Sequence, residues 1–186
     1  MIEDKYKILA FIGESGSGKD YAVAYLEQKY NFNRVIPWTT RPERKDDPHD
    51  KFHYIFTTIP EFTKEVLADN MLEVTCFNGN WYYGTHIGQL DKSKINIAVM
   101  NPEGLYYLRQ DPRVSVNVYK IVTNPKDRII RALNRQENPD CKEICRRFLA
   151  DEKQFQNYVF QNKIDVINNF TKDFEENLDN IAKVFV

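Results

Sequence analysis

The sequence is short of cysteine, of one-sided charge and of long apolar runs, and each shortage excludes a class of protein. Its three cysteines form no CxxC motif and no histidine lies near Cys141 or Cys145, which fits reduced thiols in a cytosolic protein. Lysine and arginine (26) nearly balance aspartate and glutamate (27), so bulk charge gives no sign of a nucleic-acid polymer as partner. No apolar run is long enough to span a membrane, and the first residues do not resemble a signal peptide. We therefore expect a cytoplasmic protein without a membrane partner.

Short apolar strands alternate with helical stretches along the chain. Apolar and branched residues predict strands in four segments: residues 7–12, 94–100, 114–122 and 163–168. Pro102 and the pair Asn124–Pro125 predict helix starts, because proline fits the first turn and asparagine caps it. A last helix is expected from about Thr171. This alternation predicts a single α/β domain, residues 1–186, with a mainly parallel sheet.

Two segments depart from the alternation. Residues 33–89 are rich in Thr, Pro, Asp, Tyr and Phe, which predicts short strands, turns and one helix near residues 60–70. We expect them to form an insertion into a core made of residues 1–32 and 90–186. A second polar stretch, about residues 131–147, lies between two helical patterns and is expected to form a mobile, arginine-bearing flap.

The stretch GESGSGKD, from Gly13 to Asp20, matches G-x-x-x-x-G-K-[ST] in all but its last position. Glycines let backbone N–H groups wrap phosphate oxygens at a helix N-terminus, and Lys19 can reach the β- and γ-phosphates. The alternative is a flexible linking turn, but the complete order of strand, loop, lysine and helix favours a nucleoside triphosphate site. The expected binding residues are Gly13, Glu14, Ser15, Gly16, Ser17, Gly18, Lys19 and Asp20.

Two further stretches resemble a known family. TTRPERKDDPHDKFHYIF (Thr39 to Phe56) and EVTCFNGNWYYGTH (Glu73 to His86) resemble the nucleoside monophosphate (NMP)-binding region of guanylate kinases, which shows T-T-R-x-x-R, Y-x-F and G-N-Y-Y-G-[ST]. The glycine-rich loop, NPEGLYYLR and NRQENPDCKEICRRFL follow in the family's order, so the resemblance covers nearly the whole chain. It implies a P-loop NTPase-type parallel sheet flanked by helices, with residues 33–89 as the NMP-binding insertion and residues 131–147 as a helical lid.

The resemblance implies an acceptor-phosphate site on the insertion. Arg41 and Arg44 would hold the phosphate, since two fixed guanidinium groups can grip it with paired hydrogen bonds. Tyr54 and Tyr83 would donate phenolic hydrogen bonds to it. Aligning Tyr54 requires a one-residue insertion relative to the family, so His53 competes for that role.

The resemblance also implies a base site. Glu73 would accept from guanine N1–H and N2–H₂, because two carboxylate oxygens match two adjacent donors, and Thr85 would lie near the base. Pro37 stands where the family has a serine that donates to the base, and Val99 and Asn101 replace two strand-end aspartates. Asn101 keeps hydrogen-bonding capacity without charge, so base recognition rests more on Glu73, and base and sugar specificity stay open.

Lid arginines complete the set that the resemblance implies. Arg131 and Arg135 are four residues apart on a helical pattern and are expected to share a face, while Arg128 and Arg146 are expected to be solvated neighbours. Asn168 would contact the donor adenine, with capping of the following turn as its alternative role. The expected catalytic residues are Lys19, Arg41, Arg131, Arg135 and Arg147.

Asp20 occupies the position after the loop lysine, where the related loops have Ser, Thr or Gly. In the related kinases a hydroxyl at this position can ligate Mg²⁺, and two strand-end aspartates lie near the same ion. Val99 and Asn101 stand in place of those aspartates here, so we expect Asp20 to supply the carboxylate that holds hydrated Mg²⁺. The alternative is that Asp20 only favours the helix N-terminus.

The leading prediction is a kinase that uses ATP and Mg²⁺ to convert GMP or dGMP to the diphosphate. One alternative is the same reaction on another (deoxy)nucleoside monophosphate. Another is an inactive guanylate-kinase-like binding module, although such modules typically lose the loop lysine and lid arginines that this chain retains. The sequence carries no signal of oligomeric state.

Overall fold

The core of the molecule is a five-stranded sheet in which every neighbouring pair of strands is parallel. The computed structural model describes residues 5–44, 50–77, 79–135, 137–157, 164–169 and 172–185. In sheet order the strands are β2 (Asn33–Arg34), β7 (Asn96–Val99), β1 (Tyr6–Ile12), β8 (Val114–Val122) and β9 (Asp165–Asn168). The predicted α/β fold and its four predicted strands are confirmed.

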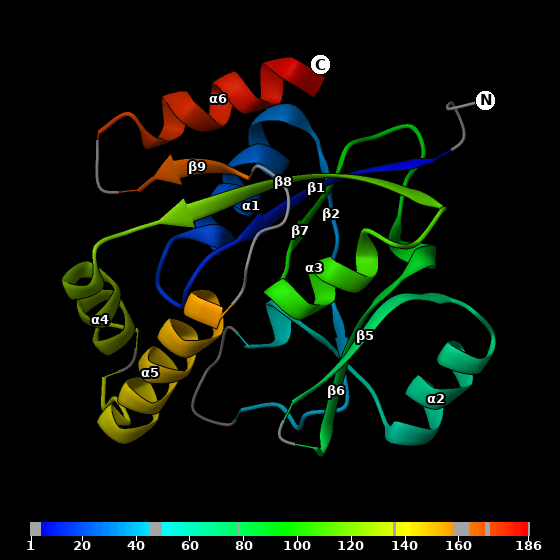
Figure 1. Cartoon of the computed structure of the whole chain (residues 1–186), viewed down its shortest axis with the longest axis horizontal. Helices are drawn as coiled ribbons and strands as arrows, with labels where there is room; N and C mark the ends of the chain where they lie inside the picture. The colour runs from blue at the N-terminus through cyan, green and yellow to red at the C-terminus, as the bar shows by residue number, and fades with distance from the viewer. Residues whose placement is uncertain are drawn as a thin grey trace.

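Three helices cover the two faces of this sheet: α1 (Lys19–Tyr30), α3 (Pro102–Leu108) and α6 (Phe174–Phe185) (Figure 1). Leu9 and Phe11 of β1 pack with apolar side chains of α1 and α6, whereas Ile8 and Ala10 belong to the cluster that includes α3. Because both faces of β1 are buried, its sequence is a near-continuous apolar run rather than an alternating one.

Helix starts follow the predicted capping residues, with one shift. Asn124 Oδ1 accepts a hydrogen bond from the Asp127 amide at 3.1 Å, and Pro125 opens α4 (Pro125–Leu133). The last helix begins at Phe174 rather than near Thr171, which lies outside the described residues. Among the described residues, no helix is long and apolar enough to cross a membrane.

The inserted segment forms a second, four-stranded sheet with one helix, α2 (Ile59–Leu67). In order its strands are β4 (Ile55–Phe56), β3 (Trp38–Thr39), β6 (Trp81–His86) and β5 (Met71–Phe77). Thr58 and Glu61 form a reciprocal capping box at the start of α2. Asn33–Arg34 pair with β7 in the core sheet, so the segment outside that sheet begins after Arg34 rather than at residue 33.

Two packed helices, α4 and α5 (Cys141–Asn157), hold two of the three predicted lid arginines, Arg131 and Arg147 (Figure 1). The prediction that Arg131 and Arg135 share a helix face is wrong, because α4 ends at Leu133 with Asn134 as its C-cap. The polar sequence between Leu133 and Pro139 offers no apolar side chain that would pack a further turn. Arg135 therefore lies in the turn beyond the helix.

Candidate active site

The glycine-rich loop joins β1 to α1 in a conformation that requires glycine. Gly16 and Gly18 have φ angles of 80° and 104°, in the left-handed region. A Cβ on Gly16 would lie 2.9 Å from the Arg128 carbonyl oxygen, and one on Gly18 would lie 2.0 Å from Asn169 Nδ2. The loop is thus packed tightly against α4 on one side and the end of β9 on the other.

Lys19 begins α1 and folds its ammonium group back under the loop. Its Nζ donates to the carbonyl oxygens of Gly13 at 2.8 Å and Glu14 at 3.0 Å. Burial lowers the pKa of the Lys19 ammonium, while the nearby carboxylates of Asp20 and Asp151 act in the opposite direction. The cation therefore lies inside the loop, next to the backbone N–H groups that suit phosphate oxygens.

Two arginines of α4 hold the loop through its carbonyl oxygens. Arg131 Nη1 donates to Gly16 O at 3.1 Å, and Arg128 Nε donates to Ser15 O at 3.1 Å. The prediction that Arg128 is solvated is wrong: only 3% of its side chain is exposed, because the loop, α4 and α5 enclose it. A charged residue on a helix gives no local sequence signal of such burial.

The end of β9 contacts the loop through a neighbour of the predicted residue. Asn169 Nδ2 donates to Ser17 O at 2.6 Å, and Asn169 O accepts from Arg131 Nη2 at 3.3 Å. Asn168 is the exposed last residue of β9. Asn169 therefore supports the loop, and the proposed adenine contact of Asn168 remains a prediction.

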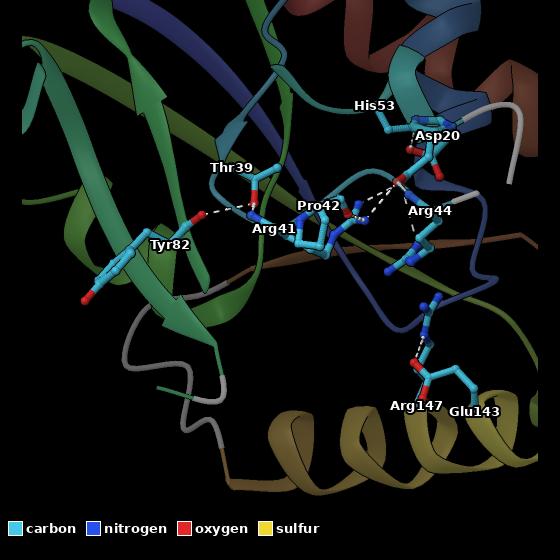
Figure 2. Close-up of polar contacts among 10 residues, drawn as sticks. Asp20, Thr39, Arg41, Pro42, Arg44, His53, Tyr82, Glu143 and Arg147 are labelled. Atoms are coloured by element: carbon cyan, nitrogen blue, oxygen red, sulfur yellow. Dashed lines mark hydrogen bonds and ion pairs between the residues drawn. The ribbon is translucent and has the colours of Figure 1, made fainter. Parts of the chain in front are cut away.

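Arg41, the first predicted phosphate ligand, is held by a carboxylate that the sequence did not single out (Figure 2). Its Nη1 and Nη2 donate to the two oxygens of Asp50 at 2.8 and 2.7 Å, and both side chains are buried. Burial alone would raise the pKa of Asp50, but hydrogen bonds from Arg41 and the Arg44 amide lower it. Arg41 Nη1 also donates to the Pro42 carbonyl oxygen at 2.7 Å, so Arg41 can offer a phosphate only the N–H groups that Asp50 and Pro42 leave free.

Aromatic rings surround the Arg41 guanidinium. Its Cζ lies 5.0 Å from the centre of the Tyr54 ring, which meets the Tyr83 ring edge-on at 5.8 Å. The competing residue His53 faces elsewhere, with Nδ1 at 3.5 Å from Asp20 Oδ1. The structure thus brings Tyr54 and Tyr83, rather than His53, to Arg41.

Arg44 faces a lid arginine across open space. Figure 2 shows Arg147 extending from α5 towards Arg44, and burial together with the charges of Arg147 and Arg41 lowers the pKa of Arg44. Arg147 Nε also donates to Glu143 Oε1 at 2.7 Å. Two guanidinium groups that face each other favour an anion between them.

The predicted base-binding residues form a buried pair between β5 and β6. Thr85 Oγ1 donates to Glu73 Oε1 at 2.9 Å, and Glu73 is 7% exposed. Burial raises the pKa of Glu73 to about 7, although the hydrogen bond from Thr85 lowers it. The other carboxylate oxygen, Oε2, faces Gly104 at the start of α3.

Asn101 is also at this helix start, where it caps α3. Its Oδ1 accepts from the Gly104 amide at 2.6 Å, so this oxygen is already engaged, while the side-chain amide group can still donate. Pro37 and Val99, the other two departures from the family pattern, line the same cavity as Glu73 and Asn101.

One cavity of about 1070 Å³ connects these groups. The predicted site residues that line it are Gly13, Ser15, Gly16, Lys19, Asp20, Arg41, Arg44, Tyr54, Glu73, Tyr83, Asn101, Arg135 and Arg147. Arg131 and Thr85 are not among the lining residues: Arg131 contacts the loop at the Gly16 carbonyl oxygen, and Thr85 contacts Glu73. The glycine-rich loop with Lys19, the buried carboxylate of Glu73 and several arginines therefore share one cavity.

Asp20 is the acidic residue of α1 next to the loop, and about half of its side chain is exposed. Within the described parts of the chain, no group of three or more His, Cys, Asp or Glu side chains is placed to hold a metal ion. Asp20 could serve as one carboxylate ligand to an Mg²⁺ that takes its other oxygen ligands from phosphate and water.

A protein-family model described as guanylate kinase matches residues 5–185 of this chain. The chain belongs to the guanylate kinase family. A guanylate kinase from Lactococcus lactis is 28% identical over 152 residues, which cover 79% of this chain and 72% of the relative. A guanylate kinase from Gloeobacter violaceus is 35% identical over 80 residues, 42% of this chain and 38% of that protein.

Solved structures show the same fold. A guanylate kinase from Anaplasma phagocytophilum superposes with a TM-score of 0.60 at 21% identity, covering 97% of this chain and 85% of its own. A gluconokinase from Sinorhizobium meliloti superposes with a TM-score of 0.52 at 10% identity, covering 97% of both chains. At these identities the likeness concerns the fold alone.

Proposed function

We propose that the protein transfers the γ-phosphoryl group of ATP to GMP or dGMP. The observation that carries this proposal is the single cavity that joins the loop with Lys19 to the carboxylate of Glu73. Transfer between two nucleotides requires a phosphate site and a base site in one chamber closed to water. Membership of the guanylate kinase family supports the same reaction.

In this reaction an oxygen of the acceptor phosphate attacks the γ-phosphorus of ATP. The bond from that phosphorus to the β,γ-bridging oxygen breaks, and ADP leaves with the bond's electron pair. Positioning and charge neutralisation supply most of the catalysis. Lys19 would act on the β- and γ-phosphates, and Arg135 and Arg147 would approach from the lid side of the cavity.

The acceptor phosphate would lie between the insertion and the lid. Arg44 and Arg147 face each other across this space (Figure 2), and Arg41 and Tyr83 line the same cavity. Mg²⁺, when bound to the triphosphate, would neutralise part of its charge, and Asp20 is the residue that would hold it.

The base would meet Glu73. A carboxylate accepts two hydrogen bonds side by side, and guanine N1–H and N2–H₂ offer two adjacent donors. Thr85 keeps the carboxylate oriented, and the free amide group of Asn101 can donate towards the ligand. This arrangement favours guanine over bases that lack paired donors on one edge.

A coupled assay with ATP and a panel of ribo- and deoxynucleoside monophosphates tests the proposal. We expect transfer to GMP and dGMP well above AMP, CMP, UMP and dTMP. A clear preference for another base would replace guanine as the substrate. Binding of nucleotides without transfer to any acceptor would instead indicate a binding module.

A further inference from the structure

A carboxylate from the lid helix occupies part of the phosphate-binding loop. Asp151, on α5, accepts a hydrogen bond from the Ser15 backbone N–H at its Oδ2, with a donor–acceptor distance of 2.5 Å. Ser15 belongs to the loop whose backbone N–H groups suit phosphate oxygens. A carboxylate oxygen carries the same sign of charge and the same acceptor chemistry as a phosphate oxygen, so Asp151 mimics part of the ligand.

A buried arginine lies next to this carboxylate with one nitrogen unused. Arg128 donates from Nε to Ser15 O at 3.1 Å and from Nη1 to Glu152 Oε1 at 2.9 Å. In the part of the chain that the structure describes, its Nη2 has no hydrogen-bond partner, although the side chain is only 3% exposed. That nitrogen lies 3.9 Å from Asp151 Oδ2, just beyond hydrogen-bonding distance.

We propose that Asp151 is a placeholder for a nucleotide phosphate, and that phosphate binding transfers its carboxylate from the Ser15 N–H to Arg128 Nη2. This inference rests on the proposed nucleoside triphosphate site. Phosphate takes the Ser15 N–H, and Asp151 passes to a buried donor whose lack of a partner is unfavourable, so the exchange recovers part of the hydrogen bond that Asp151 gives up.

The exchange links loop occupancy to the lid. Asp151 and Arg147 are four residues apart on α5, so they project from the same side of that helix. Both line the cavity, and the Asp151 charge also acts on buried Lys19. Entry of a phosphate would therefore break the hydrogen bond between Asp151 of α5 and the loop. This bond lies one helical turn from Arg147, the arginine that faces Arg44. Asp151 and Arg128 are positioning residues in this scheme and do not touch the transferred group.

The test compares Asp151→Asn with the unaltered protein, using isothermal titration with pyrophosphate and with a non-hydrolysable ATP analogue. Charge-assisted hydrogen bonds are roughly twice as strong as neutral ones, so removing the charge should lower both dissociation constants by about three- to tenfold. Asp151→Ala, which removes the competing acceptor altogether, should lower them at least as much. The dissociation constant for guanosine, which has no phosphate and would meet the protein through its base at Glu73, should not change.

Glu152→Gln is the matched control, because Glu152 is the next residue on α5 and pairs with the same arginine at 2.9 Å, without a hydrogen bond to the loop. An equal gain in pyrophosphate affinity in this variant would show a general charge effect and overturn the inference. Unchanged affinity in both Asp151 variants, with pyrophosphate and the analogue still binding, would also overturn it and leave the proposed function intact. No binding of either ligand to any of the proteins would remove the triphosphate site and the inference together.

Discussion

Asp20 Oδ1 lies 3.5 Å from Nδ1 of His53, so the first turn of α1 meets the inserted subdomain directly beside the phosphate-binding loop (Figure 2). Arg34 Nη2 approaches the same ring nitrogen at 3.4 Å. When Nδ1 of His53 carries no hydrogen, it can accept a hydrogen bond from Arg34. When it carries one, it can donate to Asp20. Asp20 thus has a protein partner as well as the metal role proposed for it, and the two must be separated by experiment.

Asp20→Asn should raise the Mg²⁺ concentration needed for half-maximal activity by about tenfold, a typical effect of changes around a metal site. The melting temperature without nucleotide should change little, because the carboxylate is half-exposed. His53→Gln is the control, since it removes the imidazole that contacts Asp20 and keeps the carboxylate. If Asp20→Asn lowered the melting temperature and left the Mg²⁺ requirement unchanged, the only remaining role of Asp20 would be to stabilise the N-terminus of α1.

Lys19→Ala should leave the fold intact and lower turnover by about 10²–10³-fold, as expected when one preorganised electrostatic group is lost. Circular dichroism checks the fold and steady-state kinetics check the turnover. Lys64→Ala on α2, an exposed lysine outside the cavity, should behave like the unaltered protein. Turnover within a few fold of normal in the Lys19 variant would contradict the assignment of this loop.

Glu73→Gln should weaken GMP binding and spare ATP. The amide keeps one acceptor but places a donor opposite a guanine donor, and a buried polar group without a partner costs about 1–3 kcal/mol. Calorimetry with GMP and with an ATP analogue measures both effects. If GMP bound both proteins equally well, Glu73 would not be the group that reads the base.

The raised pKa of Glu73 also predicts a pH dependence. Because guanine needs the ionised carboxylate and the pKa of Glu73 is about 7, GMP affinity should rise about tenfold between pH 6 and pH 8, with proton release on binding. Glu73→Gln corrects for the titration of the GMP phosphate and should lack the Glu73 component.

The stability of the unliganded protein should depend on pH in the opposite direction. The pKa of Glu73 in the folded protein lies above the ordinary value of 4.5, so the contribution of Glu73 to stability is complete below pH 4.5 and is lost as the pH rises through about 7.

Asp179 ties α6 to α1 and should govern acid stability. Lys29 Nζ donates to it at 2.8 Å, the hydroxyls of Tyr25 and Tyr30 donate at 2.9 Å, and together they lower the pKa of Asp179 to about 2. A lowered pKa means that the stabilisation is present above the ordinary value of 3.8 and is lost as the pH falls through about 2.

Asp179→Asn should therefore lower the melting temperature at pH 7 and flatten its decline between about pH 4 and pH 2. Thermal unfolding across this range measures both effects. Glu176→Gln, an exposed residue of the same helix, should keep the profile of the unaltered protein. If the melting temperature of the Asp179 variant had the same pH dependence as that of the unaltered protein, the hydrogen bonds from the three donors to Asp179 would add nothing to stability beyond what hydrogen bonds to water provide.

The sequence predicted the parts of the structure that local patterns determine. The strand at residues 114–122 matches β8 residue for residue, because an apolar, β-branched run carries its own signal. The loop from Gly13 to Asp20 was predicted for a similar reason, since its glycines and lysine are contiguous. The joint placement of Lys19, Arg44 and Glu73 on one cavity came from the family resemblance rather than from spacing.

The parts that the sequence did not predict depend on contacts between distant segments. Several acidic residues follow Arg44, and nothing in their order marks Asp50 as the partner of Arg41. Arg128 resembles any charged helical residue until the loop carbonyl of Ser15 and the carboxylate of Glu152 enclose it. The acidic pair Asp151–Glu152 on the next helix was the one hint that a buried cation needed a counter-charge.

The position of β1 in the sheet constrains when nucleotide binding can arise during folding. Ile8 pairs with Asn96 on one side and with Val116 on the other, so both neighbours of β1 lie about a hundred residues further along the chain. Closing such long loops is entropically costly and slows folding. A nascent chain that has emerged only as far as β6 has its glycine-rich loop and Lys19 but neither strand that flanks β1. If the loop binds nucleotide as proposed, we expect the nucleotide to stabilise only late intermediates, in which β8 has already joined the sheet.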